Sequence, residues 1–542
     1  MNKIENSLIE LVFEASKELG GQKEKIMIEI PRDTQNGDYS TNIAMQLAKE
    51  LHTNPFPIAE QIKANIEKLN KDIKVEVARP GFINFYMPKE SIANSLLDII
   101  KEGDNYGKNE SGKNKKVLVE YVSANPTGDL HLGHAKGAAW GDSMTRILKA
   151  SGYDVLREYY LNDSGNQVDN LAESLISRYF ECFNKSYPLP EDGYHGEDVR
   201  KIAIEVAKEE GDKWLNKEEG RHEYFKKLGI RKELDKILND LKAFRVEFDS
   251  FVSEQELRDS GKVEKALQSL IDKGLTYEED GAIWFKTEQF GDDKNRVLKK
   301  SDGSLTYLVP DIANHLYKLE RGYKHLVNLW GADHHGYILR LKAALSAFGY
   351  NDVLDVDIIQ IVRLVENGVE IKMSKRTGNA VTLRELMEDV GVDATRYFFS
   401  SRACESHLDF DLGLAKKQDS DNPVYYAQYA HARMCSIIRQ ASDIEETNKL
   451  DSLNSEKEIN LIKHLNEFTA TVSDAARTRS PNKICNYIQR LAQYFHSFYD
   501  SNKVIDKDNM ELSKQRLMLV KASKITLKNA LDLIGVSSPE IM

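Results

Sequence analysis

Apolar side chains recur at helical spacing near both ends of the chain. Ile4, Leu8, Leu11, Val12 and Ala15 fall on one face of a predicted N-terminal helix. The same three- and four-residue spacing near the C-terminus joins Ile484, Tyr487, Ile488, Leu491, Phe495 and Phe498. Such spacing continues after about Leu414, so we expect that part to be almost wholly helical.

Four strand candidates, the first of which looks buried, mark the middle of the chain. They are Val117–Val122, Val155–Tyr160, Lys324–Leu329 and Val356–Leu364. The first run leads into a turn with Pro126 and Gly128, and then into a helical stretch from about Gly133 to Ala150. A strand, a tight turn and a helix in that order indicate the start of a parallel nucleotide-binding sheet.

The remaining segments complete a three-part organisation. Residues 1–112 have the pattern of a small α/β unit that ends in a polar linker. The segment from about 164 to 302 is charged and mostly helical, so we expect it to be an insertion between two halves of the sheet. We therefore predict an α/β fold with a parallel-sheet domain over 113–414 and an all-helical domain over 415–542.

The composition, 41% hydrophobic and 30% charged residues, is that of a globular protein and not of a disordered one. The N-terminus lacks a basic start followed by an apolar run, and no stretch approaches the roughly 20 apolar residues of a membrane helix. We therefore expect a cytoplasmic protein with no membrane partner. The four cysteines form no CxxC pair, so we expect buried structural thiols and no zinc site.

The net charge of −11 argues against a nucleic-acid partner for the chain as a whole, but an average can hide patches. From Ala415 to the end there are 18 Lys+Arg against 16 Asp+Glu, and the remainder has 57 against 70. This difference is small. It permits RNA binding by the C-terminal part without demonstrating it.

The motif His131-Leu132-Gly133-His134 stands where the predicted turn meets the helix. Imidazoles can donate hydrogen bonds to phosphate oxygens, and Gly133 lets a nucleotide approach the backbone at the helix N-terminus. Donors placed there would stabilise charge on an α-phosphate during in-line attack. Taken alone, two histidines beside a tight turn fit a purely structural role equally well.

A second motif, Lys372-Met373-Ser374-Lys375-Arg376-Thr377-Gly378, follows a strand-like run and the turn residues Asn367-Gly368. Three cations on a glycine-ended loop suit a triphosphate whose pyrophosphate must leave. A short basic run alone is usually a solvated loop. The two motifs together, about 240 residues apart, are far more specific than either one.

Together the two motifs resemble the signatures of class I aminoacyl-tRNA synthetases. Further segments resemble the arginyl-tRNA synthetases in particular, in the same order and over essentially the whole chain. These are SANPTGDLHLGH at 123–134, NDSGNQ at 162–167, DGAIWF at 280–285, SDGSLTYLVPDIA at 301–313, GADHHGY at 331–337 and NPVYYAQYAHAR at 422–433. Leu132 and Arg376 depart from the commoner Ile and Ser of the signatures, but both histidines and the second lysine are present.

The resemblance implies a Rossmann-type catalytic domain that forms arginyl-adenylate from ATP and L-arginine, and then transfers arginine to the terminal ribose of tRNA(Arg). By motif position, the expected catalytic residues are His131, His134 and Lys375. The expected ATP-binding residues are His131, Gly133, His134, Asp333, Lys372, Met373, Ser374 and Lys375. The family also implies Mg²⁺ with the ATP, and a monomeric protein.

Arginine selection can be argued from chemistry as well, because a planar guanidinium with five donors needs carboxylates. The resemblance implies that Glu120, Tyr307 and Asp311 hold the guanidinium, and that Ser123 and Asn125 hold the α-amino and α-carboxylate groups. Without the motifs, Glu120 would be interpreted as a surface acid at a strand end and Asp311 as a helix N-cap. With them, we favour an arginine pocket.

The resemblance also implies tRNA contacts at both ends of the chain. The C-terminal helical domain would bind the anticodon stem and loop, and Tyr425, Tyr429 and Arg433 suit stacking and phosphate contact there. Tyrosines at helical spacing are as often core residues, so this assignment stays open. The N-terminal unit resembles the family's extra domain, which contacts the outer corner of tRNA.

Two other functions fit part of the pattern. A nucleotidyltransferase of the same HxGH superfamily would transfer AMP to a small molecule, but its usual size is far smaller and it needs no large helical domain. A non-catalytic RNA-binding relative would have eroded signatures, whereas both motifs, Glu120 and Asp311 are intact here. We therefore expect a ligase that joins arginine to tRNA.

Overall fold

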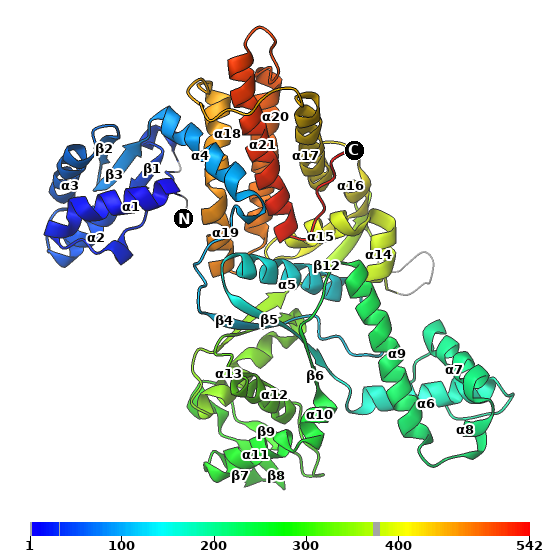
Figure 1. Ribbon diagram of the computed structural model, residues 1–542. Coiled ribbons are helices and arrows are strands. Elements are labelled where there is room, and N and C mark those ends of the chain that lie inside the picture. Colours follow the sequence, from blue (N-terminus) through cyan, green and yellow to red (C-terminus); the bar gives the residue numbers. More distant parts are fainter. Residues whose placement is uncertain (1–2, 32, 372–379) are drawn as a thin grey trace.

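A five-stranded parallel sheet lies in the middle of the molecule (Figure 1). The computed structural model describes residues 3–31, 33–371 and 380–542. The strands of this main sheet lie in the order β11-β10-β4-β5-β6. Their bounds are β4 Lys116–Glu120, β5 Asp154–Leu161, β6 Ser250–Ser253, β10 Leu326–Gly331 and β11 Leu354–Ile359. Each neighbouring pair is parallel, which confirms the predicted α/β fold class.

The order of the strands changes direction at β4. From β4 the chain adds β5 and β6 on one side, and it adds β10 and β11 later on the other side. In open parallel sheets, ligands bind beyond the carboxyl ends of the strands at such a switch point. The main sheet therefore places a crevice at the end of β4, where Glu120 lies.

Alternate side chains of β4 enter two different cores. Val117 and Val119 pack in the core that contains α5 (Leu132–Ala150), whereas Leu118 packs in the core that contains α12 (Leu308–Glu320). Both faces of this strand are thus covered by helices. Burial on both faces explains why its sequence is a nearly continuous apolar run.

Two details of the main sheet differ from the sequence prediction. β6 lies inside the segment 164–302, which the sequence predicts as a helical insertion, yet it pairs with β5 as the fifth strand. The run Val356–Leu364 is not one strand, because its second half belongs to a separate three-stranded sheet. That sheet contains β12 Val362–Glu366, β13 Val369–Glu370 and β14 Leu408–Asp411.

The C-terminal part is helical, as predicted. Its helices are α17 Pro423–Gln440, α18 Glu456–Asn466, α19 Phe468–Arg477, α20 Asn482–Ser501 and α21 Met510–Leu533. They lie above α5 and α15 (Val392–Ser400) in Figure 1, and their apolar faces share one core with the main sheet. The boundary at 414 stays a prediction, and the shared core shows that the helices on either side of it are packed together.

The N-terminal unit has a core of its own, which contains residues from Leu8 to Phe85. Its elements are α1 Lys3–Ser16, α2 Ile43–Glu50, α3 Pro55–Leu69, β1 Tyr39–Thr41, β2 Lys74–Ala78 and β3 Phe82–Tyr86. The next helix, α4 (Lys89–Glu102), packs against α18 and α21 instead. The predicted boundary at 112 stays a prediction, but the packing changes before α4.

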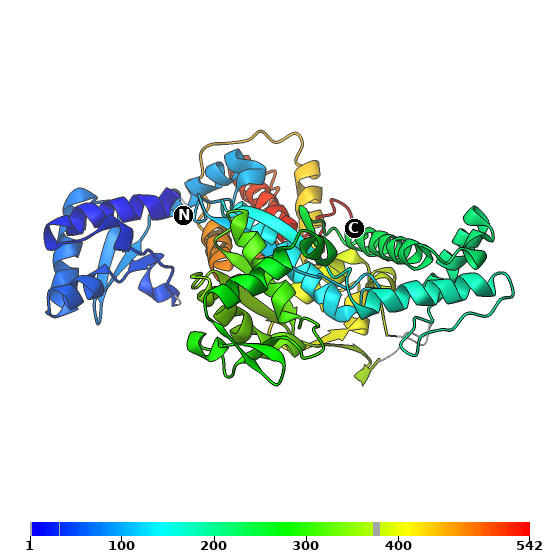
Figure 2. The ribbon, with the colours of Figure 1, turned by 90° about the horizontal axis from the view of Figure 1, so that it is seen from below.

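A helical arm extends from the main sheet on the side away from the N-terminal unit, in both Figure 1 and Figure 2. It contains α6 Asn166–Glu181, α7 Glu197–Glu210, α8 Lys213–Asn216 and α9 Arg221–Ala243, around a small core of its own. A separate antiparallel sheet follows, with β7 Thr276–Glu279, β8 Ala282–Phe285 and β9 Arg296–Lys299. The segment 164–302 is therefore mostly helical, as predicted, but β6 and this small sheet interrupt it.

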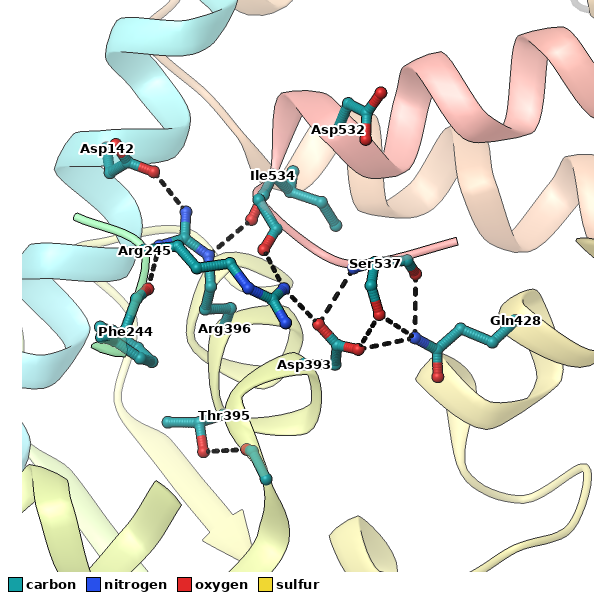
Figure 3. Close-up of polar contacts among 12 residues, drawn as sticks. Asp142, Phe244, Arg245, Asp393, Thr395, Arg396, Gln428, Asp532, Ile534 and Ser537 are labelled. Carbon is teal, nitrogen blue, oxygen red and sulfur yellow. Dashed lines mark hydrogen bonds and ion pairs between the residues drawn. The ribbon is translucent and has the colours of Figure 1, made fainter. Parts of the chain in front are cut away.

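A buried arginine joins four distant parts of the chain (Figure 3). Arg396, on α15, is fully buried and forms an ion pair with the buried Asp142 on α5. Its other nitrogens donate to the carbonyls of Phe244 at 2.8 Å and Ile534 at 3.0 Å, which end α9 and α21. Beside it, Asp393 binds Arg245, Gln428 and Ser537. We call this set of contacts the junction.

No helix in the described part of the chain is long and apolar enough to span a membrane. Cys404, Cys435 and Cys485 are buried, as predicted. Cys182 is exposed, so the prediction of a buried thiol is wrong there. It follows directly after α6 on the arm, where the small core does not reach it.

Candidate active site

The two histidines of the HLGH motif cap the first helix after β4. His131 is the N-cap of α5, and its Nδ1 accepts hydrogen bonds from the backbone N–H groups of Gly133 at 3.0 Å and His134 at 3.4 Å. In return, Nδ1 of His134 accepts from the N–H of His131 at 3.4 Å. The two rings stack with their centroids 3.7 Å apart. The local sequence therefore fixes both rings at the N-terminus of α5.

These contacts also determine the protonation state of the rings. Burial lowers the pKa of His131, although Asp333 opposes this shift, and burial with the neighbouring His131 lowers the pKa of His134 to about 3. Both rings are therefore neutral near pH 7. Because each Nδ1 accepts a backbone hydrogen bond, the proton lies on Nε2. Each histidine thus presents one N–H donor away from the helix.

The chain turns sharply between β4 and this helix. Val122 and Ser123 have φ values of 68° and 40°, in the left-handed region that a β-branched residue rarely adopts. The turn directs Ser123 back to the strand, where its hydroxyl donates to Glu120 at 3.4 Å and accepts from the N–H of Tyr160 at 3.1 Å. Asn125 follows and donates to Gln167 at 2.6 Å.

Asp311 lies in the first turn of α12 and faces the same region. Its carboxylate accepts a hydrogen bond from the hydroxyl of Tyr337 at 2.7 Å. Burial raises the pKa of Asp311 to about 7, and the nearby Glu120 and Glu254 add to the shift, whereas the Tyr337 hydrogen bond opposes it. A cation bound beside this carboxylate would favour its ionised form. Asp311 is therefore poised to respond to a cationic ligand.

One pocket of about 1190 Å³ brings these groups together at the switch point of the main sheet. The predicted site residues that line it are Glu120, Ser123, Asn125, His131, Gly133, His134, Tyr307, Asp311 and Asp333. They come from loops and elements that are more than 200 residues apart in the sequence, from Glu120 to Asp333. Tyr307 is 81% exposed, so it is open to a ligand that enters the pocket.

Lys372, Met373, Ser374 and Lys375 lie outside the described residues. Ile371 and Ala380, the described residues on either side of positions 372–379, both line the pocket. Shortly after, Thr382 forms an antiparallel bridge with His131, and the N–H of Leu383 donates to the carbonyl of Leu130 at 2.7 Å. The chain thus enters and leaves the second motif at the edge of the pocket.

Several pocket residues were not predicted from the sequence. They are Tyr160 on β5, Glu254 on α10 (Glu254–Asp259), and Tyr337 and Arg340 near the start of α13 (Ile338–Ala347). Tyr337 ends the segment GADHHGY, so its motif position could have identified it. Glu254 depends on the pairing of β6 with β5, for which the sequence has no clear signal, whereas Tyr160 ends the predicted strand Val155–Tyr160. The described residues contain no group of three His, Cys, Asp or Glu side chains that could hold a metal ion.

A second, aromatic pocket of about 420 Å³ lies between α17 and α20. It is lined by Ser420, Tyr425, Tyr426, Tyr429, His496 and Asp500. The rings of Tyr425 and Tyr429 are parallel with centroids 6.3 Å apart, and the guanidinium of Arg433 lies 5.7 Å from the Tyr429 ring centre. Tyr429 is 37% exposed, so it is not a fully buried core residue.

Comparison with known proteins agrees with this geometry. The family model for the catalytic domain of class I (R) tRNA synthetases matches residues 95–400, more than half of the chain. The model for the arginyl tRNA synthetase N terminal domain matches residues 2–87, and that for the DALR anticodon binding domain matches residues 427–542. The chain belongs to the arginyl-tRNA synthetase family.

Members of this family resemble the chain over nearly its full length. The arginine–tRNA ligase of Bacillus licheniformis is 50% identical, covering 99% of this chain and 98% of the relative. That of Bacillus subtilis is 52% identical, covering 95% and 94%. The Thermus thermophilus arginyl-tRNA synthetase structure has a TM-score of 0.78 at 23% identity, covering 99% of this chain and all of that chain, so it shares the fold.

Proposed function

We propose that the chain is an arginine–tRNA ligase that activates L-arginine with ATP and transfers it to the 3′ end of tRNA(Arg). One observation carries this proposal. A single pocket at the switch point of the main sheet contains the HLGH histidines at one part and the carboxylates Glu120 and Asp311 at another. Phosphate donors and acids for a guanidinium are what a joint ATP and arginine site requires.

The histidine part of the pocket would bind ATP. His131 and His134 would donate from Nε2 to phosphate oxygens, and Gly133 would let the phosphates approach the N-terminus of α5. Asp333 would contact the adenosine, and Lys372, Met373, Ser374 and Lys375 would complete the phosphate site. Mg²⁺ would arrive with the ATP, since the metal ion usually binds through substrate phosphates in such sites.

The carboxylate part would bind arginine. Glu120 and Asp311 would face the guanidinium, with Tyr307 beside them. Ser123 and Asn125 would hold the α-amino and α-carboxylate groups. An arginine placed in this way has its carboxylate directed toward the histidines, which is the orientation that reaction with the α-phosphate needs.

Two group transfers follow from this arrangement. An arginine carboxylate oxygen attacks the α-phosphorus of ATP, the bond to the β-phosphate breaks, and pyrophosphate leaves. The neutral histidine donors and Lys375 would stabilise the charge that develops on the transferring phosphate. A hydroxyl of the terminal ribose of tRNA then attacks the arginyl carbonyl carbon, and AMP leaves with the bonding electron pair.

The C-terminal helices would bind the tRNA at a distance from this chemistry. The aromatic pocket offers the rings of Tyr425 and Tyr429, and the cation of Arg433 lies beside the Tyr429 ring, which suits an unstacked base and its phosphate. We also propose that the protein acts as a monomer, and that it acts in the cytoplasm, where protein synthesis takes place.

A pyrophosphate-exchange assay tests the proposal. Each of the 20 amino acids would be supplied with ATP and labelled pyrophosphate, with and without tRNA. We expect exchange into ATP with arginine and background exchange with the other amino acids. Exchange with a different amino acid, or none with arginine in the presence of tRNA, would refute the assignment.

A further inference from the structure

A lysine that does not line the pocket lies beneath its acidic part. Lys318, on α12, is fully buried and forms an ion pair with Glu120. Its ammonium is also 3.8 Å from a carboxylate oxygen of Glu158, which is fully buried too and pairs with Arg321. Burial of an unpaired ammonium is strongly unfavourable, so Lys318 depends on these acids for its place in the core.

The ion pair fixes how Glu120 faces the pocket. Lys318 binds Oε2 of Glu120, whereas Oε1 is on the side of Ser123, whose hydroxyl donates to it. Ser123 and Glu120 line the pocket. One oxygen of Glu120 is therefore bound by Lys318, and the other, which accepts from Ser123, lies beside a residue that lines the pocket.

Lys318 also sets the charge of this part of the pocket. Three carboxylates line it, those of Glu120, Glu254 and Asp311. Glu254 pairs with Arg258 at 2.6 Å, and Glu120 pairs with Lys318. With all three acids ionised, the group has one net negative charge, which a single guanidinium neutralises. Without Lys318 it would have two.

We propose that Lys318 is a positioning residue for arginine, which holds one oxygen of Glu120 and leaves the three carboxylates and their two cationic partners with a single negative charge for the guanidinium. This inference rests on the proposed function of the pocket. A lysine that only fills the core would instead affect stability, and it would affect ATP and arginine alike.

The pH dependence of arginine binding separates these two roles. The charged and titratable groups around Glu120 and Asp311 are Glu158, Tyr160, Glu254, Arg258, His315, Lys318, Arg321, Tyr337 and Arg340. Burial raises the pKa of Asp311 to about 7, and Lys318 is among the groups that lower it. Bound arginine requires the ionised form of Asp311, so the affinity of the enzyme for arginine should rise as the pH increases through this pKa. Loss of Lys318 should move that rise to higher pH.

The test compares Lys318→Met and Lys318→Arg in the full-length enzyme, with KM for arginine and for ATP measured in tRNA charging across pH. Lys262→Met is a matched control. It removes a surface lysine that pairs at 3.3 Å with Glu320, which is on α12 like Lys318. For Lys318→Met near neutral pH we expect an arginine KM about tenfold higher and an ATP KM within about twofold of the wild type. The arginine KM should recover partly at alkaline pH. Lys318→Arg and the control should resemble the wild type.

The double variant Glu120→Gln with Lys318→Met provides a second test, in case Lys318→Met alone impairs folding. In a Glu120→Gln background, Lys318→Met should raise the arginine KM by less than it does alone, because the carboxylate that the lysine holds is already gone. An additive increase, an unchanged arginine KM in Lys318→Met, or an equal rise for arginine and ATP at every pH would overturn the proposal. A wild-type enzyme that charges no arginine would refute the proposed function instead.

Discussion

Asp311 is the pocket residue whose ionisation depends most clearly on its surroundings. Its pKa of about 7 places the carboxyl between its neutral and ionised forms near neutral pH, since burial and the acids around it oppose ionisation. A guanidinium is always protonated, and it would draw Asp311 fully into the ionised form. The negative charge of the pocket is therefore not fixed, because part of it would develop when a cationic ligand binds.

Asp311→Asn should weaken arginine binding by about 2–5 kcal/mol, and Glu120→Gln should do likewise. For the wild type, arginine affinity should rise with pH through about 7, because the group gains its charge there. Asp311→Asn should lose this rise, since an amide does not ionise. Calorimetric titration with arginine at several pH values measures both effects. Equal losses for arginine and ATP would show general misfolding and not a lost pocket contact.

Lys375→Ala should slow formation of the adenylate about 10²–10³-fold while thermal stability stays near that of the wild type. The physical reason is that the ammonium would act on charge that develops only in the transition state. Single-turnover measurement of ATP consumption with saturating arginine and tRNA reports this step. Activation at a near-normal rate would remove Lys375 from the mechanism.

At the level of elements, the junction connects helices that otherwise belong to separate parts of the chain. Arg396 of α15 contacts α5, the end of α9 and the end of α21 (Figure 3). α5 is also the helix that His131 caps. The position of the histidines thus depends on packing that reaches into the C-terminal helices.

Arg396→Met should destabilise the fold by about 3–5 kcal/mol, because it leaves the buried Asp142 with only the partly exposed Arg146 as an ion-pair partner. The double variant Arg396→Met with Asp142→Leu should recover part of the loss, since it buries no unpaired charge. Thermal unfolding followed by circular dichroism compares the two. A single variant with an unchanged transition would contradict this account of the junction.

Strongly apolar elements could be predicted from the sequence, and weak ones could not. β4 and β10 are mostly apolar, and β5 has apolar residues on either side of Arg157 and Glu158, so the three strands have a recognisable pattern. β6 has only four residues, with serine at each end, inside a charged segment. It becomes a strand because β5 offers an unpaired edge, which is tertiary information.

The candidate site shows the same limit. Glu120 and Asp311 are 191 residues apart, and within the sequence only the resemblance to a known family indicates that they share one pocket. Lys318 was not predicted, although it stands seven residues after Asp311 and so shares its helix face. Its partner Glu120 lies on a different strand, and no spacing along the chain indicates that pairing.

For the whole molecule, the shared core determines how tRNA binding can be tested. A fragment that ends near Leu414 would expose the apolar surface that the C-terminal helices now cover. Such a fragment would fail through misfolding, whatever its tRNA contacts. Point substitutions in the aromatic pocket avoid this problem, because Tyr429 is 37% exposed.

Tyr429→Ala should weaken tRNA binding by about 1–3 kcal/mol, the usual contribution of one stacked base. Arg433→Ala should also weaken binding and reduce its dependence on salt, as the loss of a phosphate contact would. Tyr494→Ala is a control at equal exposure (38%) on α20. Filter binding with tRNA(Arg) across salt concentrations gives the comparison. Equal effects at Tyr429 and Tyr494 would argue against a specific site in the aromatic pocket.

The chemical identity of the product tests the central claim most directly. The protein would be incubated with ATP, a mixture of all amino acids and unfractionated tRNA, and the 3′-terminal adenosine would then be released and analysed by mass spectrometry. Our account predicts adenosine esterified with arginine, formed on tRNA(Arg) and dependent on ATP. An adenosine that carries another amino acid, or AMP joined to a small molecule with no aminoacylated tRNA, would contradict it.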